Sequence, residues 1–281
     1  MVGITNKTLI AEIRRQQQLS QGIVEGQTAI STGISLTKPS DDALAWVQVS
    51  EIGKAQAQQS AWKANISYGT TRAANAEANL EQITTLLVRA QELVTSARNG
   101  SLNASGRAAI VEEMKTIRTT IDTMLTQKDY QGVPVFDDTQ SVLVPVSRGL
   151  NLAVVGTRQD VSEGIDVNGT PMSLDDIMAQ NITALESGTD ADLIASLDAI
   201  RAGQTHIVVE QAKQGVRCDR LDVIGERLTN IDLDLSERRQ GLEATDLAEV
   251  ISSVKAKLLQ LEAAQSAFAR INQQTLFDLI R

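Results

Sequence analysis

The sequence predicts a mainly α protein, with long antiparallel coiled-coil helices, paired N- and C-terminal helices and a small β-rich insert. Aromatic residues make up only 2% of the 281 residues, so aliphatic side chains must supply the core. Three of the four prolines fall between residues 134 and 171, which leaves residues 40–133 and 172–281 without this helix breaker. In both tracts apolar residues recur at alternating steps of three and four, the spacing of a coiled-coil seam.

The first proline-free tract predicts two antiparallel helices. One seam of small and apolar residues runs from Ala73 to Ala97 and stops at Asn99-Gly100, a helix C-terminal signal. A second seam, from Ile110 to Met124, starts again after Asn103 or Ser105. So short a connection predicts a helical hairpin.

The C-terminal tract contains two seams that are out of phase with each other. The first runs from Leu221 to Leu235 and the second from Leu247 to Phe268. The break in phase lies between Gly241 and Asp246, where glycine lets a helix bend or unwind. We expect a domain boundary there.

The two chain ends are expected to pair with each other. The N-terminal seam is half polar, because Gln16, Ser20 and Gln27 occupy it, so this helix has too little apolar area to be stable alone. The C-terminal run carries apolar side chains that can pack against this N-terminal helix. The predicted assembly interface consists of Leu9, Ile13, Ile23, Ile30, Leu247, Ile251, Val254, Leu258, Leu261, Phe268, Leu276 and Phe277.

Between the helical tracts lies a segment with β character. Residues 141–147 and 151–155 are short runs rich in β-branched residues, and Asn168-Gly169 is a strong hairpin signal. The predicted domains are a terminal coiled-coil domain, a long-helix rod and an outer insert, formed by 1–40 with 241–281, by 41–136 with 183–240, and by 137–182.

The sequence contains few residues that could catalyse a reaction or bind a metal ion. One cysteine and one histidine exclude a disulfide framework, a Cys-rich metal site and most zinc or triad chemistry. We predict that Cys218 is a small buried hydrophobe and that His206 lies at the edge of a helical interface. The adjacent acids of Asp41-Asp42 and Asp175-Asp176 are interpreted as helix starts. No catalytic, cofactor or metal motif is present, so we expect a protein that is not an enzyme.

Charge and hydropathy exclude two classes of partner. The net charge of −9 resides between residues 137 and 198, which hold eleven acids and two bases. An acidic chain without aromatic-basic platforms does not predict nucleic-acid binding. The sequence contains no run of 18 apolar residues, so it does not predict a membrane-spanning helix. The N-terminus lacks the pattern of a cleavable signal peptide, so any export is expected to use another route.

Both ends of the chain resemble one known family. Residues 31–46 (STGISLTKPSDDALAW), 96–110 and 130–136 resemble the N-terminal pattern of bacterial flagellins and hook-associated proteins. Residues 242–280, which end in Leu-Phe-Asp-Leu-Ile, are similar to the C-terminus of the hook-associated members. The resemblance covers both ends of the chain and leaves the insert unmatched.

This resemblance implies a structural subunit of the bacterial flagellum at the hook-filament junction, which polymerises through its terminal helices. It implies an inner domain made of the paired termini and an insert that faces outward. It also implies type III export to an extracellular position, an export chaperone, and contacts with copies of itself, the hook, another junction protein and flagellin. The alternatives are the filament flagellin itself and, more remotely, a surface adhesin or sugar-binding homologue that uses the acidic insert.

Overall fold

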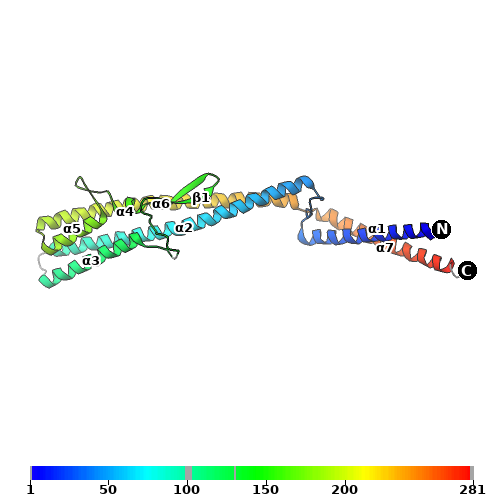
Figure 1. Ribbon diagram of the computed structural model, residues 1–281, viewed down its shortest axis with the longest axis horizontal. Helices are drawn as coiled ribbons and strands as arrows, with labels where there is room; N and C mark the ends of the chain where they lie inside the picture. Colours follow the sequence, from blue (N-terminus) through cyan, green and yellow to red (C-terminus); the bar gives the residue numbers. More distant parts are fainter. Residues whose placement is uncertain (1, 99–102, 130, 279–281) are drawn as a thin grey trace. The chain divides into compact units, whose positions relative to one another are not determined.

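The computed structural model describes the backbone of residues 2–98, 103–129 and 131–278, and within these ranges the side chains from residue 10 to residue 270. The helices and strands follow in the order α1 (Val2–Thr32), α2 (Ala43–Arg98), α3 (Ala104–Thr126), β1 (Val142–Ser147), β2 (Leu150–Val155), α4 (Arg158–Ser162), β3 (Ile165–Val167), β4 (Thr170–Met172), α5 (Leu174–Ser187), α6 (Asp190–Glu243) and α7 (Leu247–Asp278) (Figure 1). The predicted fold class is confirmed.

The chain divides into two units. Unit 1 comprises residues 1–57 and 232–281, and unit 2 comprises residues 58–231. This division falls within α2 and α6, whereas the boundaries predicted from sequence lie at the loops before α2 and after α6. Both helices run without a backbone break through the positions at which the division falls.

At one end of unit 2, four helices lie side by side, namely α2, α3, α5 and the first part of α6 (Figure 1). Ion pairs join neighbouring helices: Arg89 to Glu113 at 2.7 Å, Lys115 to Glu186 at 3.0 Å and Arg98 to Asp190 at 3.0 Å. Aliphatic side chains fill the space between the helices, as the low aromatic content predicts. The fully buried ones include Leu80, Ile83, Leu87, Met114, Ile177, Leu185, Ile200 and Ile207.

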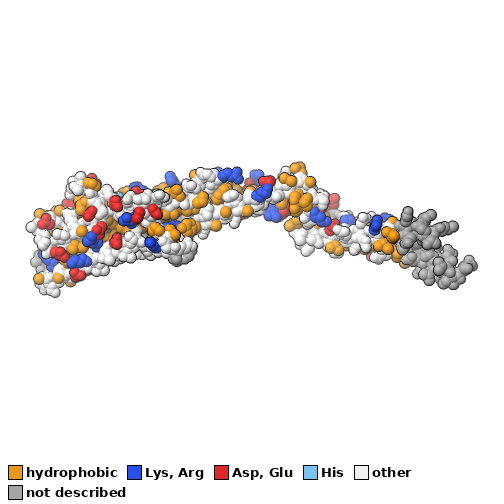
Figure 2. All heavy atoms as spheres, in the orientation of Figure 1, with side chains coloured by type: hydrophobic (Ala, Val, Ile, Leu, Met, Phe, Trp, Pro, Cys, Tyr) orange, Lys and Arg blue, Asp and Glu red, His pale blue; other side chains and the backbone are white. Residues whose placement is uncertain are grey.

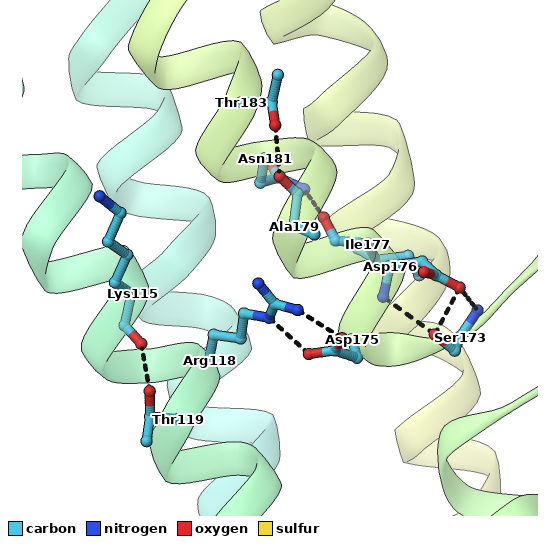
Figure 3. A network of polar contacts seen from close by, with 10 residues as sticks. All are labelled: Lys115, Arg118, Thr119, Ser173, Asp175, Asp176, Ile177, Ala179, Asn181 and Thr183. Atoms are coloured by element: carbon cyan, nitrogen blue, oxygen red, sulfur yellow. Dashed lines mark hydrogen bonds and ion pairs between the residues drawn. The ribbon is translucent and has the colours of Figure 1, made fainter.

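The start of α5 shows how local sequence sets a helix boundary. Ser173 accepts a hydrogen bond from the Asp176 backbone N–H, and the Asp176 carboxylate accepts one from the Ser173 N–H. The Asp175 carboxylate accepts hydrogen bonds from Nε and Nη2 of Arg118 in α3, at 2.5 and 2.6 Å (Figure 3). This pairing lowers the pKa of the Asp175 carboxyl. The acidic pair predicted to start a helix therefore also ties α5 to α3.

The insert contains the predicted strands. β1 and β2 pair antiparallel, and β3 and β4 form the hairpin that Asn168-Gly169 predicts, with both turn residues at positive φ, 52° and 83°. Helix α5 begins inside segment 137–182, which sequence assigns to the insert. The strands end at Met172, and the capping sequence at Ser173 opens the helix.

The β1–β2 hairpin packs on helices of unit 2. A Cβ added to Gly69 of α2 would lie 3.1 Å from Val154 and 3.2 Å from Leu221 of α6, so glycine permits this close approach. Buried Gln214 of α6 donates to the backbone oxygens of Val154 and Ala73, at 2.8 and 3.4 Å. One amide thus joins α6 to both the hairpin and α2.

A buried arginine holds the loop that follows α3. Arg72 of α2 donates to the backbone oxygen of Pro134 and pairs with Asp129 at 3.1 Å. The Asp129 carboxylate in turn accepts the backbone N–H groups of Gln131 and Val133. The guanidinium therefore compensates the carbonyl and carboxylate that this loop brings against α2.

Candidate assembly interface

In unit 1, α1 and α7 lie side by side and run antiparallel (Figure 1). Along α1 the less exposed positions form a seam with steps of three and four, made of Gln16, Leu19, Ile23, Gly26 and Ile30. The matching seam on α7 consists of Val250, Val254, Lys257, Leu261, Ala264 and Phe268. These are the periodicities of a two-helix coiled coil.

The centre of this seam is a glycine contact. A Cβ added to Gly26 would lie 2.3 Å from Cγ2 of Val254, so only glycine allows the two helices to approach this closely. One turn earlier, Lys257 reaches over Gly22, and its Nζ donates to the Gly22 oxygen at 3.5 Å. Ile23 and Val254 are each only 6% exposed as a result.

The end of α1 is tied to the break between α6 and α7. Gly33 ends α1 at φ 72°, a conformation that favours glycine. Its oxygen accepts the Thr245 N–H at 3.1 Å, and the Ser35 N–H donates to the Glu243 oxygen at 2.9 Å. The predicted phase break between residues 241 and 246 thus coincides with the helix break and with a contact between the two ends of the chain.

The loop between α1 and α2 is ordered by two acids with different roles. Asp42 accepts the backbone N–H groups of Leu44 and Ala45, both at 2.9 Å, so it caps α2 from the position just before the helix. Asp41 does not belong to the first helical turn, because its carboxylate turns back to the N–H groups of Thr37 and Lys38, both at 2.9 Å. The predicted helix start is therefore present, but neither acid lies in the first turn of α2 as the sequence predicts.

An ion pair connects this loop to α1. Lys38 Nζ lies 2.7 Å from Oε1 of Glu25. The hydrogen bond and charge of Lys38 lower the pKa of the Glu25 carboxyl, and the Thr37 and Lys38 backbone N–H groups lower the pKa of the Asp41 carboxyl. Both carboxylates therefore help to order this loop while they are ionised.

The structure brings together some of the predicted interface residues and leaves others uncovered. Five lie in the α1–α7 seam: Ile23, Ile30, Val254, Leu261 and Phe268. Four are 38–46% exposed in the single chain: Ile13, Leu247, Ile251 and Leu258. The side chains of the other three lie outside the described residues: Leu9, Leu276 and Phe277.

The seam residues that escaped the sequence analysis include Leu19 and Val250. Each of these two lies one position before the residue that the sequence pattern favours, Ser20 and Ile251 respectively. Both alternatives satisfy the alternating steps of three and four, so the spacing does not distinguish them. Ile13, Ile251 and Leu258 occupy one heptad position beside the seam. In an antiparallel pair such positions of the two helices flank the same side of the contact.

The residues singled out for chemistry have structural contacts. His206 Nε2 lies 2.8 Å from the Asp160 backbone oxygen, which makes this nitrogen the donor. Cys218 is partly buried, with Sγ 3.8 Å from a carboxylate oxygen of Glu77. Burial and that carboxylate raise the pKa of the Cys218 thiol. Within the described ranges, no group of His, Cys, Asp and Glu side chains is arranged to hold a metal ion, and no helix is long and apolar enough to cross a membrane.

The chain is a mainly α protein that combines paired terminal helices with a helical bundle and a β insert. Its relatives connect this fold with a family. Residues 5–141 match the bacterial flagellin N-terminal helical region. The chain is 26% identical to flagellar hook-associated protein 3 of Escherichia coli, over 94% of this chain and 96% of that protein.

Solved structures share the fold. A putative flagellar hook-associated protein from Vibrio parahaemolyticus aligns over 73% of this chain and 100% of its own, with a TM-score of 0.64 and 19% identity. A flagellar junction protein from Legionella pneumophila aligns over 70% and 100%, with a TM-score of 0.56 and 14% identity. The chain thus carries a flagellin N-terminal helical region and is similar to flagellar hook-associated proteins over most of its length, as its terminal motifs predict.

Proposed function

We propose that this chain is a structural, non-enzymatic subunit of the bacterial flagellum at the junction between hook and filament. The similarity to flagellar hook-associated protein 3 over nearly the whole length of both chains carries this proposal. The proposed position makes copies of this chain, the hook, the second junction protein and flagellin its partners.

The assembly domain in this proposal consists of residues 1–40 and 241–281. The α1–α7 seam buries little side-chain area, with Ile23 and Val254 as its buried hydrophobic side chains among those described. Two helices with so few buried contacts have marginal stability alone. Their uncovered apolar residues Ile13, Ile251 and Leu258 offer further area to neighbouring copies. Assembly thus buries apolar area that the single chain leaves exposed. Because the terminal helices become stable only in the assembly, free chains do not polymerise prematurely.

Export without a cleavable signal peptide, with the help of a chaperone, is part of the same proposal. A chain whose terminal helices gain much of their stability from neighbours can be kept unfolded until it leaves the cell. The released chain then orders its ends at the growing structure.

Electron microscopy of cells that lack this chain tests the junction role. We expect bare hooks without filaments, with flagellin lost to the medium, and normal filaments after the gene is restored. Capped hooks without released flagellin would identify the chain as flagellin instead. Normal filaments in the deletion strain would exclude both roles.

A charge placed at Leu258 tests the assembly domain. We expect Leu258→Glu to leave the helix content of the purified chain unchanged, because the side chain is 41% exposed, and to abolish filament attachment. Ser252→Glu is the matched control, since this exposed residue lies on the same helix away from the seam. Normal filaments from the Leu258 variant would contradict the proposed burial.

A further inference from the structure

A short backbone pairing joins the two ends of the chain inside unit 1. Ile34, in the loop after α1, pairs antiparallel with Ala244, in the break between α6 and α7. Two backbone hydrogen bonds flank this pair, at 2.9 and 3.1 Å. We call residues 33–35 and 243–245 together the β-bridge. Backbone hydrogen bonds of this kind join particular residues, so the β-bridge exists in one register only.

The α1–α7 seam by itself permits more than one register. If α1 slid along α7 by one heptad, Ile23 would lie against Val250 and Leu19 against Val254, so apolar residues would again face each other. Such a shift moves α1 by about 10 Å. The loop between α1 and α2, residues 33–42, could follow it, because ten extended residues span up to about 33 Å. Neither the heptad spacing nor the loop length therefore fixes the register.

The register of the β-bridge agrees with the contacts along the two helices. Gly26 lies eight residues before Ile34, and its contact partner Val254 lies ten residues after Ala244. At the next contact, where Lys257 reaches over α1, the corresponding separations are twelve and thirteen residues. The two segments thus advance from the β-bridge at nearly equal steps, as expected if the β-bridge determines how they pair.

The ion pair beside the β-bridge cannot fix this register. Lys38 and Glu25 both belong to the N-terminal part of the chain, so their contact ties the loop to α1 and not to α7. Both side chains are also half exposed, and exposed ion pairs contribute little to stability. The β-bridge joins the two ends through backbone groups, and the Ser35 hydroxyl adds a further hydrogen bond to the Glu243 oxygen at 3.3 Å.

We propose that the β-bridge sets the register in which α1 pairs with α7. The inference rests on the proposed function, because the register decides how the uncovered apolar side chains of both helices are arranged for neighbouring copies. A shift by one heptad would move Ile13 by about 10 Å relative to Ile251 and Leu258. The β-bridge thus positions the assembly surface without being part of the seam.

Disulfide trapping in the full chain measures the register directly. A Cβ placed on Gly26 lies 3.8 Å from the Cβ of Val254, which is the usual separation in a disulfide. Cys218→Ser removes the native thiol. Gly26→Cys with Val254→Cys reports the observed register, and Gly26→Cys with Leu247→Cys or with Leu261→Cys reports the registers one heptad away. The two shifted pairs also carry Val254→Ala, so that no methyl group meets the new side chain at position 26.

With the β-bridge intact, we expect mild oxidation to cross-link the Val254 pair about tenfold more than either shifted pair, the preference that two backbone hydrogen bonds can supply. Ser35→Pro removes one of these two donors together with the hydroxyl, and should lower the preference to about threefold. Ser35→Ala is the matched control, because it keeps the N–H donor and should keep the tenfold preference. Non-reducing gels of the purified chain read all three pairs.

Three results would overturn the proposal. They are an unchanged preference in the Ser35→Pro chain, shifted pairs that cross-link as readily as the Val254 pair while the β-bridge is intact, and no cross-link in any pair. Unchanged circular dichroism of the Ser35→Pro chain would show that its helices remain folded.

Filament formation separates this inference from the proposed function. In the deletion strain, Ser35→Ala should restore filaments, whereas Ser35→Pro should leave most cells without them. Full restoration by Ser35→Pro would overturn the link between register and assembly. If the deletion strain already had normal filaments, the junction role would fail while the cross-linking result would still stand.

Discussion

The two units use the same heptad pattern but differ in how much of it they bury. Unit 2 closes a continuous core in which residues of α2, α3, α5 and α6 are inaccessible to water. Among the described side chains of unit 1, the buried hydrophobic ones are Ile23, Leu36 and Val254. Hydrophobic side chains also remain at the surface among charged ones (Figure 2). The comparison teaches that a heptad seam specifies a partner helix but does not guarantee enough burial to stabilise the pair.

The difference follows from the number of helices that share a core. In unit 2 residues of several helices share one core, so small residues such as Ala73 and Ala76 are fully enclosed. In unit 1 two helices meet along one line, and apolar residues beside the seam, such as Ile13, Ile251 and Leu258, stay exposed to water. Unit 2 is therefore expected to dominate the stability of the free chain, while unit 1 depends on contacts in the assembly.

The largest effect is expected from a cavity in unit 2. Leu87→Ala should lower the free energy of unfolding by about 2–5 kcal/mol, because this leucine is fully buried. The neighbouring Val88→Ala is the control, and at 46% exposure it should change this free energy by no more than about 0.5 kcal/mol. Urea unfolding followed by circular dichroism measures both. Equal effects of the two variants would contradict the enclosed core.

The next effect concerns the buried arginine of unit 2. Arg72→Met removes the donor for the Pro134 oxygen and the partner of Asp129, and should cost about 1.5–3 kcal/mol. Arg89→Met is the control, because its pairs with Glu92 and Glu113 are half exposed and should contribute less to stability than the buried pair. The same unfolding measurement compares them. A larger loss for Arg89→Met would show that the loop after α3 does not depend on the buried pair.

A smaller effect is expected at the glycine contact of unit 1. Gly26→Ala brings a methyl group against Val254, which costs about 1–3 kcal/mol, while the better helix propensity of alanine returns about 1 kcal/mol. We expect faster amide hydrogen exchange in α1 and α7, and partial recovery when Val254→Ala is added. Gly22→Ala is the control, since its new methyl group meets only the mobile end of Lys257. Equal exchange in both single variants would argue against a close α1–α7 approach.

The smallest effect is expected from acid on the loop between α1 and α2. The pKa of Asp41 is lowered in the folded chain, so its contribution is present above the ordinary carboxyl pKa and is lost as pH falls through the lower folded value. Exchange of the Thr37 and Lys38 amides should therefore accelerate in acid beyond its intrinsic pH dependence. Asp41→Asn should remove this extra acid dependence. An unchanged dependence in that variant would assign the effect to another group, with Glu25 the next to test.

Much of the fold was predictable because its signals are local. The cap at Asn103, the hairpin at Asn168-Gly169 and the helix start after Ser173 each depend on side chains within a few residues. The helix break near residue 244 was visible as a change of heptad phase. The terminal motifs also predicted the family, because they are spread over both ends of the chain.

The candidate interface was less predictable because its phase depends on the partner. Leu19 and Ser20, or Val250 and Ile251, satisfy the same spacing in sequence. The contact of Gly26 with Val254 selects the first member of each pair, and nothing in the one-dimensional pattern shows that two helices approach at a glycine. The role of Arg72 was equally hidden, since its partners lie 57 and 62 residues away.

The sequence by itself determined where the long helices and the two β-hairpins lie, and it predicted that the two ends of the chain pair. These outcomes depend on periodicity and capping, which act over a few residues. Only the tertiary structure decided which stripe of each helix is buried, which charges are enclosed and which apolar rows remain open. Those outcomes depend on how closely helices approach across long stretches of chain, and local pattern carries no measure of that distance.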